Sequence, residues 1–417
     1  MSRIMVAALC GVAGIAGAAR AARSQEPVRR IALDEAVALF ARNSLELRIA
    51  RTDAARDAAR ARQAAAYPNP VAGVTHERLS GDGPGYDETY VLLSQQLRWP
   101  WESVARGRVA RVEREAGAHR VARDSLRLAF EMKRAFIEAA SAENLRDGLE
   151  EATGLVRVAL QDAAHRVTEG DLSGYALRRL RVERARYESE LSDATLAMHA
   201  ARRRLAAFLV PDGDAAMAPT GFPSGNPPDL PAAPPPPGPE IPALAAAAAA
   251  LYAAQADEQA VRRSRIPAPA ATGGYKSQRD GLAGVFLGIT LPLPLFDRRG
   301  AAAAEAAAAT ASAEAHLALA RRLVDNDLRL TVEAYQAARE RFRLFTGELL
   351  TDLEGLLRIA RMAYAEGEMS LVELLDAVDA FRTARVTAVN AHRDLWVTYF
   401  DVERAAGGAP AGPRGDR

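Results

Sequence analysis

The sequence predicts a mainly α-helical protein with a small β part, organised as two similar halves. Two long stretches have helical periodicity and contain no proline, the first beginning at Glu102 and the second near Arg299. Each half also contains two short segments in which apolar and polar residues alternate, the pattern of β-strands. The expected architecture is therefore a set of long, coiled-coil-like helices joined to a few strands.

The duplication is visible in matched landmarks along the chain. Gly107 and Gly300 follow equivalent arginines and are 193 residues apart, while Gly170 and Gly367 follow equivalent glutamates and are 197 residues apart. A nearly constant offset over such a distance indicates an internal repeat. We expect a first repeat over residues 25–210 and a second over residues 241–404.

The composition of the 417 residues excludes several classes of function. The chain has 54 basic and 53 acidic residues, and this near neutrality argues against nucleic-acid binding. Its single cysteine, Cys10, lies in the first 24 residues. A chain processed after residue 24 would have no thiol, so disulfide and thiol redox chemistry are excluded.

Residues 1–24 are predicted to be a secretory signal peptide. A basic start at Arg3 is followed by a short apolar stretch and small residues, with cleavage expected between Ala19 and Ser24. Leu9 directly before Cys10 fits lipid attachment poorly, so we do not expect a lipoprotein. No later stretch is long and apolar enough for a membrane helix.

The elements of the first repeat follow from its breaks. A helix is expected to stop at Tyr67-Pro68, because proline lacks a donor and restricts the residue before it. The expected elements are a helix over residues 34–66, strands over 71–79 and 89–99, and helices from 102 to 210 that reverse at 169–173.

The second repeat is separated from the first by a proline-rich linker, residues 211–240, with 11 prolines. Such a segment is incompatible with helix or central strand and predicts an extended crossover. The expected elements of the second repeat are a helix over residues 243–265, strands over 274–277 and 285–295, a helix from 299 to 366 and a last helix to 404. Residues 405–417 are expected to be a disordered tail.

The lengths of the predicted helices limit the class of protein. From residue 107 to 170 and from 300 to 367, an uninterrupted helix would be roughly 95–100 Å long, which is wider than a globular domain. Apolar residues spaced by three and four, such as Phe342 and Phe345, are typical of a coiled-coil seam. A cytosolic coiled-coil scaffold is compatible with these helices alone.

The strands favour a membrane protein. Alternation places aliphatic or aromatic residues on one side and small or polar residues on the other, as in strands of membrane barrels, with tryptophan at the interface. The side chains expected to face lipid are Val91, Leu93, Leu97, Trp99, Val285, Leu287, Ile289 and Leu291. A strand packed on a soluble core is the alternative. Four strands cannot close a barrel, so several chains would have to share one.

In order and spacing, several segments resemble the outer membrane efflux protein (TolC) family over nearly the whole mature chain. The segments are Ile31 to Ala36, Tyr67 to Pro70, Leu291 to Gly300 and Tyr364 to Ser370. The resemblance implies a homotrimer with a 12-stranded outer-membrane barrel, four strands per subunit, and a tunnel of long helices across the periplasm. It also implies a periplasmic adaptor and an inner-membrane pump as partners. The Pro68-Asn69-Pro70 and Leu293-Pro294-Leu295-Phe296 segments are most similar to the branch of the family that is paired with heavy-metal exporters of the resistance-nodulation-division type.

The family layout also assigns candidate sites. It implies that the turns at Gly170, Ser173, Gly367 and Ser370 meet the adaptor at the periplasmic end. It places Glu373 and Asp376 at the closed entrance, where threefold symmetry would form acidic rings that attract cations. Met369 occupies the position of the family arginine, so the resemblance does not extend to a matching salt-bridge latch. Without the family, these residues would be ordinary turn residues and solvated surface charges.

No pattern indicates catalysis, a cofactor or a metal site. The six histidines are scattered, and phosphate-binding, dinucleotide-binding and nucleophile motifs are missing from the sequence. The expected function is a passive exit duct in the outer membrane of a Gram-negative cell. The alternative is a periplasmic adaptor protein of an efflux system, which should contain a single helical hairpin. The cargo, whether metal ion, drug, solvent or protein, stays open.

Overall fold

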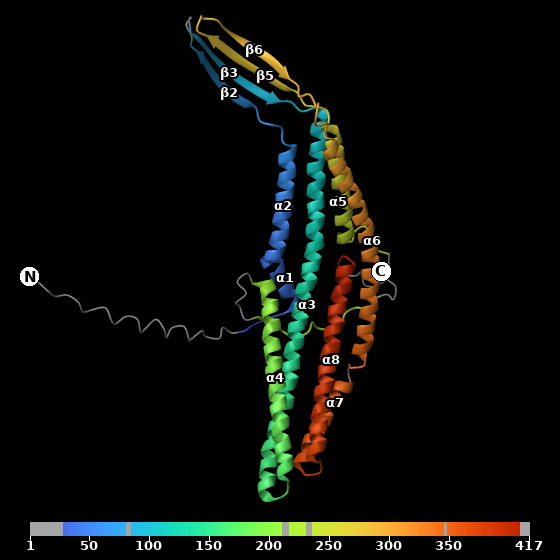
Figure 1. The fold of residues 1–417 in the computed structure, drawn as a ribbon. Coiled ribbons are helices and arrows are strands. Elements are labelled where there is room, and N and C mark those ends of the chain that lie inside the picture. The colour runs from blue at the N-terminus through green and yellow to red at the C-terminus, as the bar shows by residue number, and fades with distance from the viewer. Residues whose placement is uncertain (1–27, 81–84, 211–216, 231–235, 346–347, 409–417) are drawn as a thin grey trace, which may run out of the picture. The chain divides into compact units, whose positions relative to one another are not determined.

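The structure is a computed structural model that describes residues 28–80, 85–210, 217–230, 236–345 and 348–408. These residues divide into two compact units (Figure 1). The first, called here the helical unit, takes its described residues from 1–45, 129–228 and 337–400. The second, the sheet unit, takes them from 46–128, 229–336 and 401–417. The expected signal peptide and most of the expected tail lie outside the described residues.

The fold is mainly α-helical with a small β part, as predicted. The helices are α1 (Leu33–Asn43), α2 (Leu45–Ala65), α3 (Pro100–Glu169), α4 (Gly174–Leu209), α5 (Pro242–Arg263), α6 (Gly300–Arg343), α7 (Glu348–Ala365) and α8 (Leu371–Ala405). The strands are β1 (Arg29–Ile31), β2 (Val71–Leu79), β3 (Tyr86–Gln96), β4 (Met217–Pro219), β5 (Ala270–Gln278) and β6 (Ala283–Thr290). Among the described residues, no helix combines the length and the apolar character that a membrane span requires.

The longest helix was predicted correctly, and two other helices are interrupted. α3 has 70 residues, which corresponds to roughly 105 Å. The helix expected over residues 34–66 is broken at Ser44, which is buried and has a non-helical ψ of 122°. The helix expected from 299 to 366 is wrong as a single element, because α6 ends at Arg343 and α7 begins at Glu348. The last turn of α6 tightens into i to i+3 hydrogen bonds, with Phe345 N–H donating to Phe342 O at 2.9 Å.

The main sheet is antiparallel and has the order β2-β3-β5-β6. β2 has the predicted bounds, whereas β3 lies three residues nearer the N-terminus than expected, and β5 is longer. β6 ends at Thr290 and not at residue 295, because Pro292 and Pro294 cannot donate to a strand ladder. As a result, Leu97, Trp99 and Leu291, which were predicted to lie within membrane strands, follow the strand ends.

A second, two-stranded sheet was not predicted. β1 pairs in parallel with β4, which lies in the expected proline-rich linker, and Thr220 N–H continues the ladder by donating to Ile31 O at 2.9 Å. Pro219 is tolerated because it ends an edge strand. Ile31 and Ala218 are fully buried, so this short pairing fixes the chain before α1 onto the linker.

The core of the helical unit is formed by α3, α4, α7 and α8. Alanines on α3 and α7 lie among larger side chains from the other helices, which allows close helix approach. The largest members of this cluster are Tyr187, Tyr364, Phe381, Leu180, Leu374 and Leu375. Away from it, the buried Glu143 carboxylate on α3 accepts a hydrogen bond from Arg202 Nε on α4 at 2.7 Å and lies 3.6 Å from Arg30. A buried carboxylate of this kind is stable only because it is paired.

A stacked aromatic group attaches the linker to α8 in the helical unit. The His392 ring lies between Phe222 of the linker, at 4.1 Å between centroids, and Phe342 of α6, at 4.8 Å. Trp396 Nε1 donates to His392 Nε2 at 3.2 Å, which requires the neutral imidazole with its proton on Nδ1. Burial lowers the pKa of His392 from 6.5 to about 4.

This geometry predicts a pH dependence of stability. Because the unfolded chain binds the His392 proton more readily, the stabilisation is complete above pH 6.5 and is lost as the pH falls towards 4. We expect about 1–2 kcal/mol between pH 7 and 4.5, after allowing for the partial exposure of the ring. Thermal unfolding of His392→Phe should lack this part of the acid-induced loss. His316→Phe, at an exposed site on α6, is the matched control, and an identical pH profile for His392→Phe and wild type would contradict the assignment.

Candidate functional site

The main sheet has one apolar face that is open to the surroundings. Strand register aligns Val91 of β3 with Tyr275 of β5 and Tyr275 with Val285 of β6, and Leu93 with Gly273 and Gly273 with Leu287. The β6 side chains on this face are the most exposed, at 84 % for Val285, 90 % for Leu287 and 79 % for Ile289. The structure therefore places five of the eight predicted lipid-facing residues together on one surface: Val91, Leu93, Val285, Leu287 and Ile289.

The opposite face of the sheet is polar. Glu88 is only 3 % exposed, forms an ion pair with Lys276 and accepts a hydrogen bond from Gln278 Nε2 at 2.9 Å. Thr272 and Ser94 hydrogen-bond across β5 and β3 at 3.1 Å. Polarity thus alternates between the two faces along β5, β6 and most of β3, as the sequence pattern predicted. At the outer ends of β2 and β3 the paired residues Arg78 and Asp87 place charges on the same side as Val91.

Gly274 on this polar face has a packing role. A Cβ at this position would lie 2.6 Å from the Phe286 ring and from Val91 O. Phe286 in turn contacts Tyr90 edge-on, with ring centroids 6.3 Å apart. The close approach of β5 to its neighbours therefore requires glycine.

Both outer strands of the main sheet have an open edge. Within the described residues, β2 pairs only with β3 and β6 pairs only with β5. The backbone donors and acceptors on the outer side of β2 and β6 therefore have no ladder partner in this chain. Figure 1 shows both edges running along the full length of the sheet.

Trp99 lies between β3 and α3 and is held by two contacts. Its Nε1 donates to Pro267 O at 3.0 Å, and its ring stacks on Trp101 at 4.9 Å. Leu97 N–H donates to Pro269 O at 2.8 Å, and Leu291 is 51 % exposed. These residues form the junction between the sheet and the helices of the sheet unit, and not its apolar face.

The first of the two predicted turns, in the helical unit, joins α3 to α4. Gly170 has a φ of +87°, the left-handed conformation that glycine adopts without strain. Asp171 N–H then donates to Arg166 O at 2.9 Å, and the Ser173 side chain accepts a hydrogen bond from Ala176 N–H at 3.3 Å, which caps the N-terminus of α4.

The second turn, from α7 to α8, has the same design with a stronger cap. Gly367 has a φ of +78°, and Glu368 N–H donates to Ala363 O at 2.8 Å. Ser370 Oγ accepts from Glu373 N–H at 3.3 Å, while Glu373 Oε2 accepts from Ser370 N–H at 2.8 Å. This reciprocal pair is a capping box, and its hydrogen bonds lower the pKa of the Glu373 carboxyl group.

The two predicted acidic residues are both exposed on α8. Asp376 lies one turn after Glu373, so both carboxylates share one side of the helix. Met369, at the position of the family arginine, packs against the apolar cluster of the helical unit. It therefore contributes to the core and not to an ion pair.

Arg166 connects the two turns and was not predicted. Its Nη2 donates to Tyr364 O at 3.1 Å, its guanidinium lies 5.0 Å from the Tyr364 ring centre, and its Nε lies 3.0 Å from Asp162 Oδ2. One arginine on α3 thus caps the C-terminus of α7. No spacing rule could find a contact between residues that are 198 positions apart in the chain.

A second cross-connection joins α4 to α8. Arg382 Nη1 lies 3.1 Å from Glu190 Oε2, and Arg382 Nη2 lies 2.8 Å from Asp379 Oδ1. Partial burial lowers the pKa of Arg382, but the hydrogen bond to Asp379 and the nearby negative charges of Glu190 and Asp379 outweigh it, so the pKa is raised overall. The described residues contain no cluster of three or more His, Cys, Asp or Glu side chains that could hold a metal ion.

Comparison with known proteins agrees with this geometry. The model of the outer membrane efflux protein family matches residues 240–408, and no curated protein shows significant similarity to the chain. The CmeC outer membrane channel of Campylobacter jejuni superposes with a TM-score of 0.77 at 15 % identity, covering 92 % of this chain and 87 % of CmeC. The open-state MtrE outer membrane channel of Neisseria gonorrhoeae gives 0.70 at 17 %, covering 90 % and 89 %. A membrane protein of Pseudomonas aeruginosa gives 0.74 at 20 %, covering 90 % and 93 %.

These comparisons define the fold. The fold is that of the TolC-like outer membrane channels over about nine-tenths of the chain. The resemblance to the outer membrane efflux protein family is confirmed, in sequence for residues 240–408 and in fold for most of the chain.

The turn between α7 and α8 yields a prediction about stability. Gly367→Ala is expected to destabilise the protein by about 1–2 kcal/mol, because alanine is strained at positive φ. The matched control is Gly355→Ala inside α7, where a Cβ meets no atom within 4 Å and alanine should stabilise the helix by about 0.5–1 kcal/mol. Thermal unfolding of the purified protein measures both. A loss of stability in the control together with no loss in Gly367→Ala would refute the turn assignment.

Proposed function

We propose that this protein is a passive channel in the outer membrane of a Gram-negative cell and the exit duct of a tripartite efflux system. The main support is the sheet, with one exposed aliphatic face and two unpaired edges. In lipid, each unpaired backbone group costs several kcal/mol, so an open four-stranded sheet is not stable there. Joining β6 of one copy to β2 of the next satisfies both edges.

The number of copies follows from strand count and family resemblance. Membrane barrels have at least about 8 strands, so one chain is too few. Three copies of four strands give the 12-stranded barrel of the family, with Val91, Leu93, Val285, Leu287 and Ile289 facing lipid. The Glu88 and Lys276 face then lines the water-filled interior, where paired charges are tolerated.

The helical unit supplies the periplasmic part of the proposed duct. The α3–α4 turn and the α7–α8 turn lie at the same end of this unit, as Figure 1 shows. We assign their residues Gly170, Ser173, Gly367 and Ser370 the contact with a periplasmic adaptor. Through the adaptor the channel would connect to an inner-membrane pump, which we assign to the resistance-nodulation-division type. The two internal repeats, the signal peptide over residues 1–24 and the linker over residues 211–240 belong to the same proposal.

The acidic face of α8 favours cationic cargo. Threefold symmetry would arrange Glu373 and Asp376 as stacked carboxylate rings at the entrance. The capping box keeps Glu373 ionised to a lower pH than a free glutamate, so its ring would hold its charge in an acidified periplasm. Metal cations and cationic drugs both fit this charge. The alternative function, a periplasmic adaptor, would leave the apolar face of β6 without a lipid or protein partner.

The lipid-facing assignment predicts a face-specific effect of charge. Leu287→Arg should cost about 2–4 kcal/mol if the side chain faces the bilayer core, and should reduce the amount of trimer in the outer membrane fraction. Gly288→Arg is the matched control, because it introduces the same charge one residue away on the polar face, where a Cβ meets no atom within 4 Å. Equal trimer yields from both variants would contradict the assignment of Leu287 to the lipid-facing surface.

The ring assignment predicts a change in ion selectivity. Asp376→Asn removes one ring and leaves the capping box intact, whereas Glu373→Gln removes charge and weakens the cap. Both variants, and more strongly their combination, should lower the ratio of cation to anion permeability of purified trimers in planar bilayers. Unchanged selectivity in the double variant, with trimers of normal thermal stability, would exclude these residues from the pore.

A further inference from the structure

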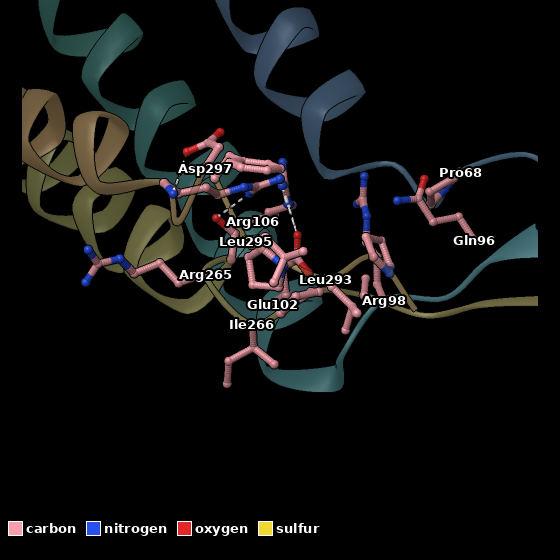
Figure 2. A pocket seen from close by; sticks show the side chains of 17 residues that line it. Pro68, Gln96, Arg98, Glu102, Arg106, Arg265, Ile266, Leu293, Leu295 and Asp297 are labelled. Carbon is pink, nitrogen blue, oxygen red and sulfur yellow. Dashed lines mark hydrogen bonds and ion pairs between the residues drawn. The ribbon is translucent and has the colours of Figure 1, made fainter. Parts of the chain in front are cut away.

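A cavity of about 640 Å³ lies in the sheet unit, at the junction where the strands meet the helices. Figure 2 shows that side chains from both sides of the junction converge on it, with Arg106, Glu102 and Asp297 close together and Arg265 extending outward. The charged residues that line it are Arg98, Arg106, Arg265, Arg299, Glu102 and Asp297. Four guanidinium groups thus face two carboxylates, which gives the cavity a net charge of +2.

The two carboxylates are already engaged. Glu102 is buried and lies 2.9 Å from Arg106 Nη2, so this pair is neutral. Asp297 accepts a hydrogen bond from Arg299 N–H at 2.7 Å, at the start of α6. Within the described residues, the guanidinium groups of Arg98 and Arg299 donate only to neutral oxygens, that of Arg98 to Ala65 O at 3.0 Å.

The Arg299 guanidinium donates to Ser264 Oγ at 2.8 Å. The exposed Arg265 side chain has no hydrogen bond or ion pair within the described part of the chain. Among the residues that line the cavity, the Asp297 carboxylate alone is left to balance Arg98, Arg265 and Arg299, so the net charge of +2 comes from these three arginines.

The backbone adds to this positive potential. α3 and α6 both begin at the junction, at Pro100 and Gly300, and helix N-termini favour anions. Arg299 has a φ of +55°, and it is the one non-glycine residue in the left-handed region among the described residues. Such strain persists where surrounding contacts hold it, here through the hydrogen bond from Arg299 N–H to Asp297.

An apolar surface adjoins the arginines. Leu293 and Leu295, which line the cavity, are 70 % and 68 % exposed, and Phe296 next to them is fully exposed. The stacked Trp99 and Trp101 lie at the same junction, and tryptophan is enriched at membrane interfaces. A ligand that matches the whole site carries negative charge at one end and hydrocarbon at the other.

We propose that this junction binds the phosphate headgroup of an anionic lipid, with the acyl chains against Leu293, Leu295 and Phe296. The proposal rests on the membrane location proposed above, which puts the ends of the strands at the lipid headgroups. Free phosphate would satisfy the arginines but would leave the leucines without a partner. The bound lipid would hold the strand ends against α3 and α6.

The test measures lipid binding to purified, detergent-solubilised protein by native mass spectrometry. Phosphatidylglycerol should bind more tightly than phosphatidylcholine. Arg265→Gln combined with Arg299→Gln should weaken phosphatidylglycerol binding by about tenfold or more. Arg321→Gln combined with Arg322→Gln, at exposed positions of α6 outside the cavity, removes the same charge and should leave binding unchanged. Arg265→Lys combined with Arg299→Lys keeps the charge and should retain most of the binding.

Three results would overturn the proposal. One is equal affinity for phosphatidylglycerol and phosphatidylcholine, and another is an equal loss of binding in the α6 control. The third is that millimolar inorganic phosphate displaces phosphatidylglycerol while a Leu293→Ser and Leu295→Ser variant binds this lipid as well as wild type. That result would assign the site to free phosphate. Conductance of the same samples in planar bilayers separates this test from the proposed function, because a conducting channel without lipid selectivity refutes the lipid site alone.

Discussion

The unpaired edges of the four-stranded sheet are the constraint on which the rest of the molecule depends. Each backbone N–H and C=O needs a partner, and β2 and β6 each find partners on one side only. The exposed aliphatic face of β6 raises the same requirement for side chains, because water is a poor environment for Leu287 and its neighbours. A single chain therefore cannot complete its own sheet. In the proposed channel, assembly with other copies in lipid would satisfy both requirements, and the polar face would then line the interior.

The helices solve a different problem, which is how to reverse direction without exposing unsatisfied helix ends. Both turns of the helical unit use a glycine at positive φ followed by a serine cap. The second turn adds Glu373 to its cap, so one carboxylate contributes both to the helix start and to the charge of its exposed face. Arg166 then joins α3 to the last carbonyl groups of α7. The two turns are thereby connected by hydrogen bonds from the Arg166 side chain to backbone carbonyl groups. These hydrogen bonds do not depend on an ion pair at position 369, where Met369 provides none.

The sequence predicted elements well wherever local chemistry ends them. β2 and α3 have the expected limits because prolines and turn residues flank them, and the turn glycines have the expected backbone angles. The prediction was wrong where a sequence pattern continues beyond the end of the element. The helical spacing of apolar residues continues across the break between α6 and α7, so it does not indicate the break. Leu97, Trp99 and Leu291 keep the alternation of the strands but lie beyond their ends. The contacts of Arg166 and the stacking of Phe222 on His392 depend on pairs that are distant in sequence, which no local pattern encodes.

The basic residues of this protein are almost all arginines, and some of these arginines connect neighbouring helices. The chain has 52 arginines and two lysines, and both lysines lie near aromatic rings, Lys133 near Phe400 and Lys276 near Tyr90. Two of the arginines make contacts that a lysine could not reproduce. Arg166 donates to two carbonyl oxygens while it covers a tyrosine ring, and Arg382 reaches Glu190 and Asp379 at once. A planar group with five fixed donors can bind several acceptors in one geometry, whereas an ammonium group is a compact point charge. With long helices that bury few large side chains, such multiple contacts hold neighbouring helices in register where a thick apolar core would otherwise do so.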